Sequence, residues 1–184
     1  MKTITIRQPY AYLICAGIKD IENRTWKTNY RGRVYIHAGI SQGKKFQINL
    51  SDDQMIAAFG SITNESINGN FSFGAILGYV DVVDCTINHQ SIWAEKSEGT
   101  YVGHTFVYKE GCKPTYNWVL ANPVLFDKPI ENVKGKLSFW DYPNIHFEPD
   151  DTGKIVCMCN LNIEEKYQVI SILNEDRCMY CGGI

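Results

Sequence analysis

One segment of the sequence, Gly74 to Cys85 (GAILGYVDVVDC), has the strongest strand character in the chain. Further strands are expected at residues 3–7, 33–38, 103–108, 116–121 and 123–126. The expected strands outnumber the expected helices, and the gaps between them are rich in turn residues. We therefore expect an α+β fold in which a small, mainly antiparallel β-barrel carries flanking helices at its ends.

Two helices are expected in the first third of the chain. The first follows the first strand, because Pro9 suits the first helical position and Gly17 is a natural C-terminal stop after apolar residues at helical spacing. The second is expected within residues 43–60, where Ser51 and Gln54 resemble a capping box. The Asn-, Ser- and Gly-rich stretch that follows it is predicted to be an exposed loop.

Composition limits the class of protein. The chain has 184 residues, of which 45% are hydrophobic and 21% charged, enough for one buried core with an appendage. No run is long enough to cross a membrane and the N-terminus does not resemble a signal peptide, so we expect a soluble cytoplasmic protein. A net charge of −2 argues against a wide basic surface for long nucleic acid, but it allows a small ligand held by a few local cations.

The side chains that a nucleotide site requires gather near residues 17–37. Arg and Lys can meet phosphate or a base carbonyl, Glu can accept from an exocyclic amine, and Trp or Tyr offers a stacking face. The candidate ligand-binding residues are Arg7, Gln8, Lys19, Glu22, Arg24, Trp26, Tyr30 and Arg31. The first two sit where a helix begins, and N–H groups exposed there favour an anion. Alternatively, Glu22 and Arg24 form an internal ion pair and Trp26 belongs to the core.

The same region carries the pattern G-x-K-x-x-E-x-R. Its fixed positions are Gly17, Lys19, Glu22 and Arg24. With this pattern, residues 6–38 closely resemble the ASCH domain of the PUA-like superfamily. The strand expected at 74–85 is similar to the next core strand of that family, and residues 117–140 are similar to its closing strand, Asn-Pro turn and terminal element. The resemblance covers about residues 1–142 and implies a PUA-like β-barrel whose signature residues line a cleft that binds RNA or a nucleotide-like ligand.

One branch of this family implies a hydrolase instead of a binding protein. That branch is an amidohydrolase that acts on N4-acetylcytidine with a Lys, a Thr and a Glu. The Lys matches Lys19, but Glu22 stands at the position of the Thr, so the hydroxyl nucleophile is absent. A partner carboxylate would have to come from Asp81 or Asp84. Hydrolysis of a modified nucleoside or RNA by an activated water stays the alternative, with His37 as either an acid–base group or a core residue.

Four of the seven cysteines crowd into the C-terminal tail. They form two close pairs, Cys157-x-Cys159 and Cys178-x-x-Cys181. Four thiolates at this spacing can complete a tetrahedral structural zinc site, which leaves no open position for catalysis. Reduced structural thiols are the alternative, and disulfides are disfavoured by the expected compartment. An acidic, Pro-containing stretch near residue 143 is expected to separate an ASCH-like domain, 1–142, from this Cys-rich extension, 143–184.

Overall fold

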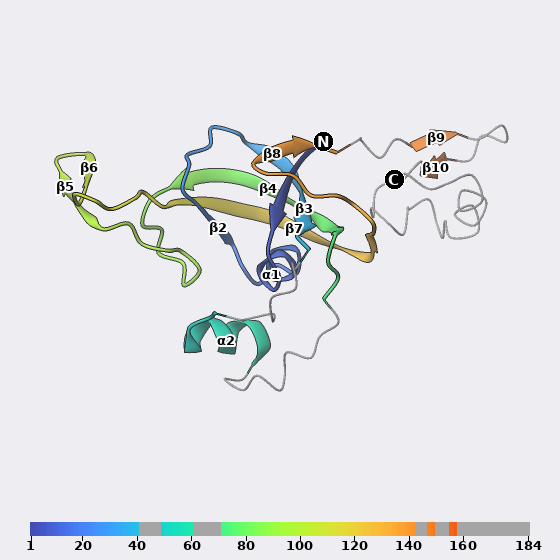
Figure 1. The fold of residues 1–184 in the computed structure, drawn as a ribbon, viewed down its shortest axis with the longest axis horizontal. Helices are drawn as coiled ribbons and strands as arrows, with labels where there is room; N and C mark the ends of the chain where they lie inside the picture. Colours follow the sequence, from blue (N-terminus) through green and yellow to red (C-terminus); the bar gives the residue numbers. More distant parts are fainter. Residues whose placement is uncertain (41–48, 61–70, 143–146, 150–154, 158–184) are drawn as a thin grey trace.

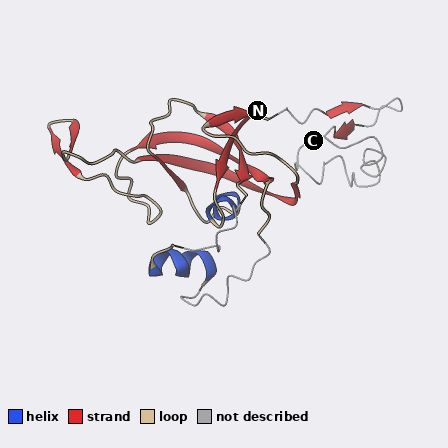
Figure 2. Cartoon of the chain, in the orientation of Figure 1, coloured by secondary structure: helices blue, strands red, loops and turns tan. Residues whose placement is uncertain are grey.

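The computed structural model describes residues 1–40, 49–60, 71–142, 147–149 and 155–157. In chain order its elements are β1 (Lys2–Ile6), α1 (Tyr10–Cys15), β2 (Ile21–Arg24), β3 (Gly32–Ala38), α2 (Asp52–Phe59), β4 (Ala75–Thr86), β5 (Gly99–Val102), β6 (Thr105–Tyr108), β7 (Tyr116–Ile130), β8 (Phe139–Asp141), β9 (Phe147–Pro149) and β10 (Ile155–Cys157). Strands dominate this part of the chain (Figure 2). Neither of its helices is long and apolar enough to cross a membrane.

Six strands form one curled sheet in the order β2-β7-β4-β3-β1-β8 (Figure 1). Its neighbouring strands are antiparallel except for β1 and β3, which are parallel. The strands β2 and β8 are the two edges of the sheet and do not pair with each other. The mainly antiparallel fold is therefore confirmed, whereas the expected barrel is an open half-barrel.

Aromatic side chains join the two edges of the sheet, β2 and β8, which are not joined by backbone hydrogen bonds. Trp26, which follows β2, packs edge-on against Trp118 of β7 and Phe139 of β8, with ring centroids 4.5 and 5.4 Å apart. Trp118 and Phe139 stack on each other at 5.1 Å. Such ring pairs contribute about 0.5–1.5 kcal/mol each beyond their buried area. The half-barrel is thus closed by side chains and not by hydrogen bonds between strands.

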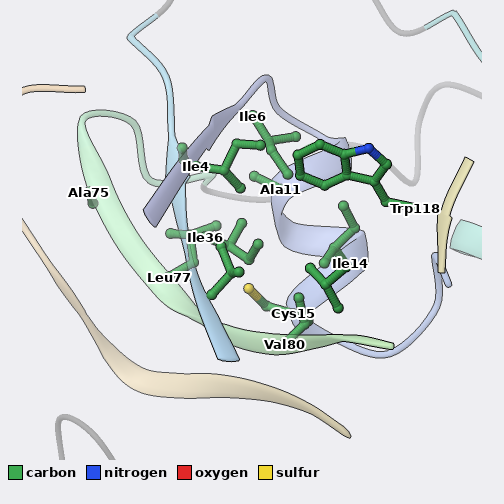
Figure 3. Packing of buried hydrophobic residues seen from close by; sticks show 13 residues of the cluster. Ile4, Ile6, Ala11, Ile14, Cys15, Ile36, Ala75, Leu77, Val80 and Trp118 are labelled. Atoms are coloured by element: carbon green, nitrogen blue, oxygen red, sulfur yellow. The ribbon is translucent and has the colours of Figure 1, made fainter. Parts of the chain in front are cut away.

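The main core lies between the curled sheet and α1. Figure 3 shows Ile4 and Ile6 of β1 facing Ile14 and Cys15 of α1, and Trp118 belongs to the same buried cluster. The helix is buried on two sides, because Ala11, Ile14 and Cys15 pack in the main core while Leu13 packs with Ile21 and Trp93 in a second cluster. Since six residues cannot form a stable helix alone, this packing holds α1 in place. Gly17 ends the segment with a φ of +75°, as the sequence predicted.

The strand β7 differs from its prediction. Two strands were expected, at 116–121 and 123–126, but the structure has one continuous strand from Tyr116 to Ile130. Asn122 adopts a left-handed conformation with a φ of 49°, and the register against β4 shifts nearby. The Asn-Pro sequence therefore makes an irregularity in the strand and not a turn. The partner β4 is long enough to continue the ladder past it.

Other local predictions agree with the structure to different extents. The capping box of Ser51 and Gln54 is present at the start of α2, which is shorter than expected. Residues 41–48 and 61–70 lie outside the described residues. The strand expected at 103–108 corresponds to β6, and its partner β5 was not predicted. In the tail, β9 and β10 pair antiparallel. Residues 161–174, whose apolar side chains at helical spacing predict a helix, lie outside the described residues.

Candidate functional site

A tight turn after α1 brings the signature lysine back beneath the helix. The backbone N–H groups of Ile18 and Lys19 both donate to the carbonyl oxygen of Leu13, at 2.9 and 3.0 Å. The left-handed Gly17 makes this reversal possible, and a side chain there would also meet the ring of Pro123 at 3.0 Å. The glycine of the signature therefore has a structural role, which is to aim Lys19 at the strand that follows.

Lys19, Glu22 and Arg24 form one ionic network. The Lys19 ammonium donates to the Ile21 carbonyl oxygen and to Glu22 Oε2, which lies 3.3 Å away. The other carboxylate oxygen, Oε1, is 3.0 Å from the Arg24 guanidinium. The side chains are 4%, 12% and 22% exposed, in sequence order. Glu22 also lines a small cavity in the half-barrel whose other walls are apolar side chains.

Arg24 connects the edge strand β2 to the opposite side of the half-barrel. Its guanidinium donates to the carbonyl oxygen of Thr5 in β1 at 3.0 Å. Its Nε is buried and has no hydrogen-bond partner among the described residues. An unpaired buried donor costs about 1–3 kcal/mol, so this arrangement of Arg24 is held against a local cost. The ion pair between Glu22 and Arg24, one of the two alternatives that the sequence allowed, is therefore present. The Arg24 Nε has no acceptor among the described residues.

Tyr10 connects the ionic network to further charges. The Lys19 Nζ lies 5.8 Å from the centroid of its ring. Burial raises the pKa of Tyr10, the negative charges of Glu95 and Glu22 raise it further, and the positive charge of Arg7 opposes them. This electrostatic influence on Tyr10 is what associates Arg7 and Glu95 with the ionic network. We call the six residues Arg7, Tyr10, Lys19, Glu22, Arg24 and Glu95 the Lys19 cluster.

Two asparagines fasten the loop that carries Glu95, residues 87–98, to the sheet. Asn23 of β2 donates to the carbonyl oxygen of Trp93 at 2.8 Å and accepts from the Glu95 N–H at 3.1 Å. Asn117 of β7 is fully buried and donates both to the Asn23 side chain and to the Glu95 carbonyl oxygen. Trp93 packs with Ile21 in a small buried group. The loop is thereby fixed beside the signature strand.

The remaining ligand-binding candidates are engaged elsewhere. Gln8 is buried, donates to the carbonyl oxygen of Ser72 and accepts from a helix N–H, so it fixes the start of α1. Trp26 packs between the sheet edges, as the alternative interpretation expected. The Tyr30 hydroxyl donates to a nearby backbone carbonyl oxygen. Arg31 pairs with Asp84 at 2.9 Å. The structure brings Lys19, Glu22 and Arg24 into contact, and Arg7 acts electrostatically on the neighbouring Tyr10, whereas these four are not part of the group.

The groups considered for hydrolysis are dispersed. Asp84 pairs with Arg31, and Asp81 accepts from Asn122 at 2.9 Å, so neither supplies a carboxylate to Lys19. Thr25 is exposed. His37 is buried, and its Nε2 is hydrogen-bonded to the Val133 carbonyl oxygen at 2.9 Å, as for a core residue.

Sequence reasoning missed two members of the cluster. Tyr10 follows Pro9 directly and was noted only as an apolar residue of the helix. Glu95 is far away in the sequence and carries no local signal. Its position depends on the pairing of β2 with β7, which puts Asn23 opposite Asn117.

Comparison with known proteins identifies the family of the chain. The sequence model of the ASCH domain matches residues 4–130, well over half of the chain. The chain belongs to the ASCH domain family. The ASCH region is similar to activating signal cointegrator 1 of Homo sapiens, 28% identical over 89 residues, which are 47% of this chain and 15% of that protein. For the Mus musculus protein the identity is 28% over 138 residues, 73% of this chain and 22% of the relative. The chain thus spans less than a quarter of these relatives.

Proposed function

We propose that the Lys19 cluster of this ASCH domain binds RNA, or a modified nucleotide-like ligand, at a single nucleotide. The observation that carries the proposal is the mostly buried ionic network of Lys19, Glu22 and Arg24, in which the Arg24 side chain is 22% exposed. RNA binding is what the ASCH resemblance implies. The cluster adds the chemistry for it: cations for a phosphate or a base carbonyl, carboxylates for an exocyclic amine, and a phenol ring.

The charge balance of the cluster supports this proposal. Arg7, Lys19 and Arg24 are three cations against the two carboxylates of Glu22 and Glu95, which leaves a net charge of +1 in a chain whose overall charge is −2. A buried ion pair with one partner of each sign would suffice to join β2 to β1. Placing a second cation near it adds a desolvation cost with little gain in stability. An anionic ligand would offset that excess positive charge.

The test is ligand-induced thermal stabilisation with a panel of nucleotides, modified nucleosides and short RNA oligonucleotides. We expect wild type to be stabilised and the variants Lys19→Ala and Arg24→Ala to lose this response. Both side chains also support the fold, so Arg7→Ala and Glu95→Gln are needed as well. These two side chains are exposed and can change without opening the core. Each is expected to weaken binding by about tenfold, the loss of one charged hydrogen bond.

The matched control is Arg33→Ala. It removes the same charge as Arg7→Ala, but from an exposed site where Arg33 pairs with Asp81 at 3.6 Å. We expect ligand affinity to stay at the wild-type value. A panel that gives no stabilisation of wild type, or equal losses in Arg7→Ala and Arg33→Ala, would contradict the proposal.

A hydrolase is the second candidate, and the contact between Lys19 and Glu22 favours it. These groups could act as an acid–base pair on a water molecule, since no hydroxyl nucleophile takes the place of the missing Thr. Incubation with N4-acetylcytidine and with labelled RNA, followed by mass spectrometry, tests this candidate. Turnover that Glu22→Gln abolishes would support it, and no product at high protein concentration would exclude it for these substrates.

We also propose a structural zinc ion held by the four tail cysteines. Cys159, Cys178 and Cys181 lie outside the described residues, and only the backbone of Cys157 is described, in β10. The spacing of the pairs is what supports the site. Within the described residues, Cys15, Cys85 and Cys112 are free thiols, and no group of His, Cys, Asp or Glu there could hold a metal. Metal analysis of purified protein should find one zinc per chain.

A further inference from the structure

A two-stranded hairpin projects from the half-barrel and belongs to neither the core nor the Lys19 cluster. The strands β5 and β6 pair antiparallel and form a sheet of their own. Figure 1 shows the hairpin at the far left, beyond the ends of β4 and β7. Residues 99–108 (GTYVGHTFVY) contain no Asp, Glu, Lys or Arg. An exposed and uncharged hairpin of this kind requires an explanation, because it is a surface that other molecules can contact.

One face of the hairpin carries a row of aromatic rings. Residues directly opposite in an antiparallel pair share a face, and Tyr101 lies opposite Phe106. Their ring centroids are 5.1 Å apart, and Phe106 is 5.1 Å from Tyr108. Tyr108 is in turn hydrogen-bonded to Tyr116, and burial together with this bond raises the pKa of Tyr108. We call these four residues the aromatic row.

The aromatic row leads to the signature strand. Tyr116 is the first residue of β7 and is the register partner of Arg24 in β2. It also packs against the main core. The row thus begins at the exposed Tyr101, which is 59% exposed, and ends beside the arginine of the Lys19 cluster. The hairpin is therefore linked to the signature strand by two ring contacts, a hydrogen bond between Tyr108 and Tyr116, and the strand register of Tyr116 with Arg24.

The hairpin is firmly built at its base. Lys109 and Glu98 form an ion pair at 2.7 Å, and the Lys109 N–H donates to the Glu98 carbonyl oxygen at 2.9 Å. Phe106 covers Gly99 so closely that a Cβ there would meet its ring at 2.7 Å. Since two-stranded hairpins are marginal by themselves, these contacts hold the exposed rings in a defined arrangement. Glu98 is already paired, so its charge is partly neutralised where a phosphate backbone would pass.

We propose that the aromatic row is a stacking platform for the bases of single-stranded RNA, which it guides towards the Lys19 cluster. The inference rests on the proposed function, because continuity with that site is what selects RNA as the partner. Aromatic side chains stack on any base, so an uncharged row suits an RNA contact without sequence preference. The cluster would hold one nucleotide, and the row would hold those next to it.

The experiment compares two RNA ligands on the full chain, a single nucleotide and a single-stranded oligonucleotide of about 12 nucleotides, a length typical of single-strand binding sites. We expect Tyr101→Leu to weaken binding of the oligonucleotide by about tenfold, the loss of one stacked base, and to leave the single nucleotide unaffected. Tyr101→Phe keeps the ring and should bind both ligands as wild type does. Val102→Ala changes an exposed residue of the other hairpin face and is the matched control.

The failures of the two proposals are distinguishable. If Tyr101→Leu binds the oligonucleotide as wild type does, the platform is refuted, whatever the cluster binds. If the oligonucleotide responds to Tyr101→Leu but not to Lys19→Ala, the platform stands and the proposed site at Lys19 fails. Equal losses in Tyr101→Leu and Tyr101→Phe would also overturn stacking, because the ring would then not be the group that matters.

Discussion

At the scale of single residues, each signature position does a different physical task. Gly17 makes the turn that returns the chain beneath α1. Glu22 holds a cation on each of its two oxygens, and Arg24 spans from β2 to β1. Removing one partner of such a buried network costs about 3–5 kcal/mol, because it leaves an uncompensated charge. The signature therefore serves both the fold and the proposed site, and variants within it must be interpreted for both.

His37 provides a pH test of the core. Burial lowers its pKa below the ordinary value of 6.5, although its bond to Val133 opposes this effect. In the unfolded chain His37 takes up a proton as the pH falls through about 6.5, while in the folded chain it stays neutral to a lower pH. The unfolded state then binds more protons, so the free energy of unfolding should fall as the pH drops below 6.5 and stay level above it.

Urea unfolding between pH 5.5 and 8 measures this dependence. The variant His37→Gln keeps a donor for the Val133 carbonyl oxygen but cannot titrate. Its free energy of unfolding should change less between pH 7 and 5.5 than that of wild type. An identical pH dependence in the two proteins would show that His37 is not responsible.

At the scale of elements, the 87–98 loop matters because of how it is attached. The Asn117 side chain donates hydrogen bonds to the Asn23 side chain and to the Glu95 carbonyl oxygen, and it accepts one from the His89 N–H. It connects β7, β2 and the loop in one buried group. A loop held by such bonds keeps Glu95 in a defined place, which a binding site requires.

The variant Asn117→Ala tests this attachment. Leaving buried polar groups unpaired should lower the free energy of unfolding by about 1–3 kcal/mol. It should also weaken ligand binding, because Glu95 would lose its fixed position. The exposed Leu125 lies in the same strand, and Leu125→Ala should change stability by less than about 0.5 kcal/mol and leave binding unchanged. Denaturant unfolding and the thermal-shift assay measure the two effects. Normal ligand affinity in Asn117→Ala would argue against a role for the loop.

At the scale of the whole molecule, charge and shape indicate a ligand contacted at few phosphates. The net charge of −2 provides no general attraction for RNA, and the excess positive charge we identify is confined to the Lys19 cluster. The aromatic row adds contact area without adding charge. Binding to RNA should therefore depend only weakly on salt.

Measuring affinity for the 12-nucleotide RNA across salt concentrations checks this expectation. Each phosphate contact on a single strand adds about −0.7 to the slope of log K against log salt. Two or three contacts predict a slope between about −1 and −2. A slope steeper than about −4 would indicate a wide basic surface and contradict the proposed mode of binding.

Much of the fold could be predicted because its signals are local. The strand patterns at 33–38 and 74–85, the glycine stop at Gly17 and the capping box at Ser51 each depend on residues within a few positions of one another. The prediction failed at Asn122, where the local Asn-Pro sequence indicated a break. There the strand continues past Asn122 because its backbone pairs with β4, whose residues are distant in the sequence.

The sequence by itself determined the ASCH family, several strands of the main sheet and the three charged residues Lys19, Glu22 and Arg24. Only the tertiary structure decided which residues from distant parts of the sequence lie near these three. It fastened the loop that carries Glu95 beside β2 and placed Trp26 between the two edges of an open half-barrel. The physical reason is distance along the chain. A helix stop or a charge pair within one turn depends on residues that are neighbours in the sequence. A contact between β2 and the 87–98 loop, in contrast, forms only when β7 pairs with β2.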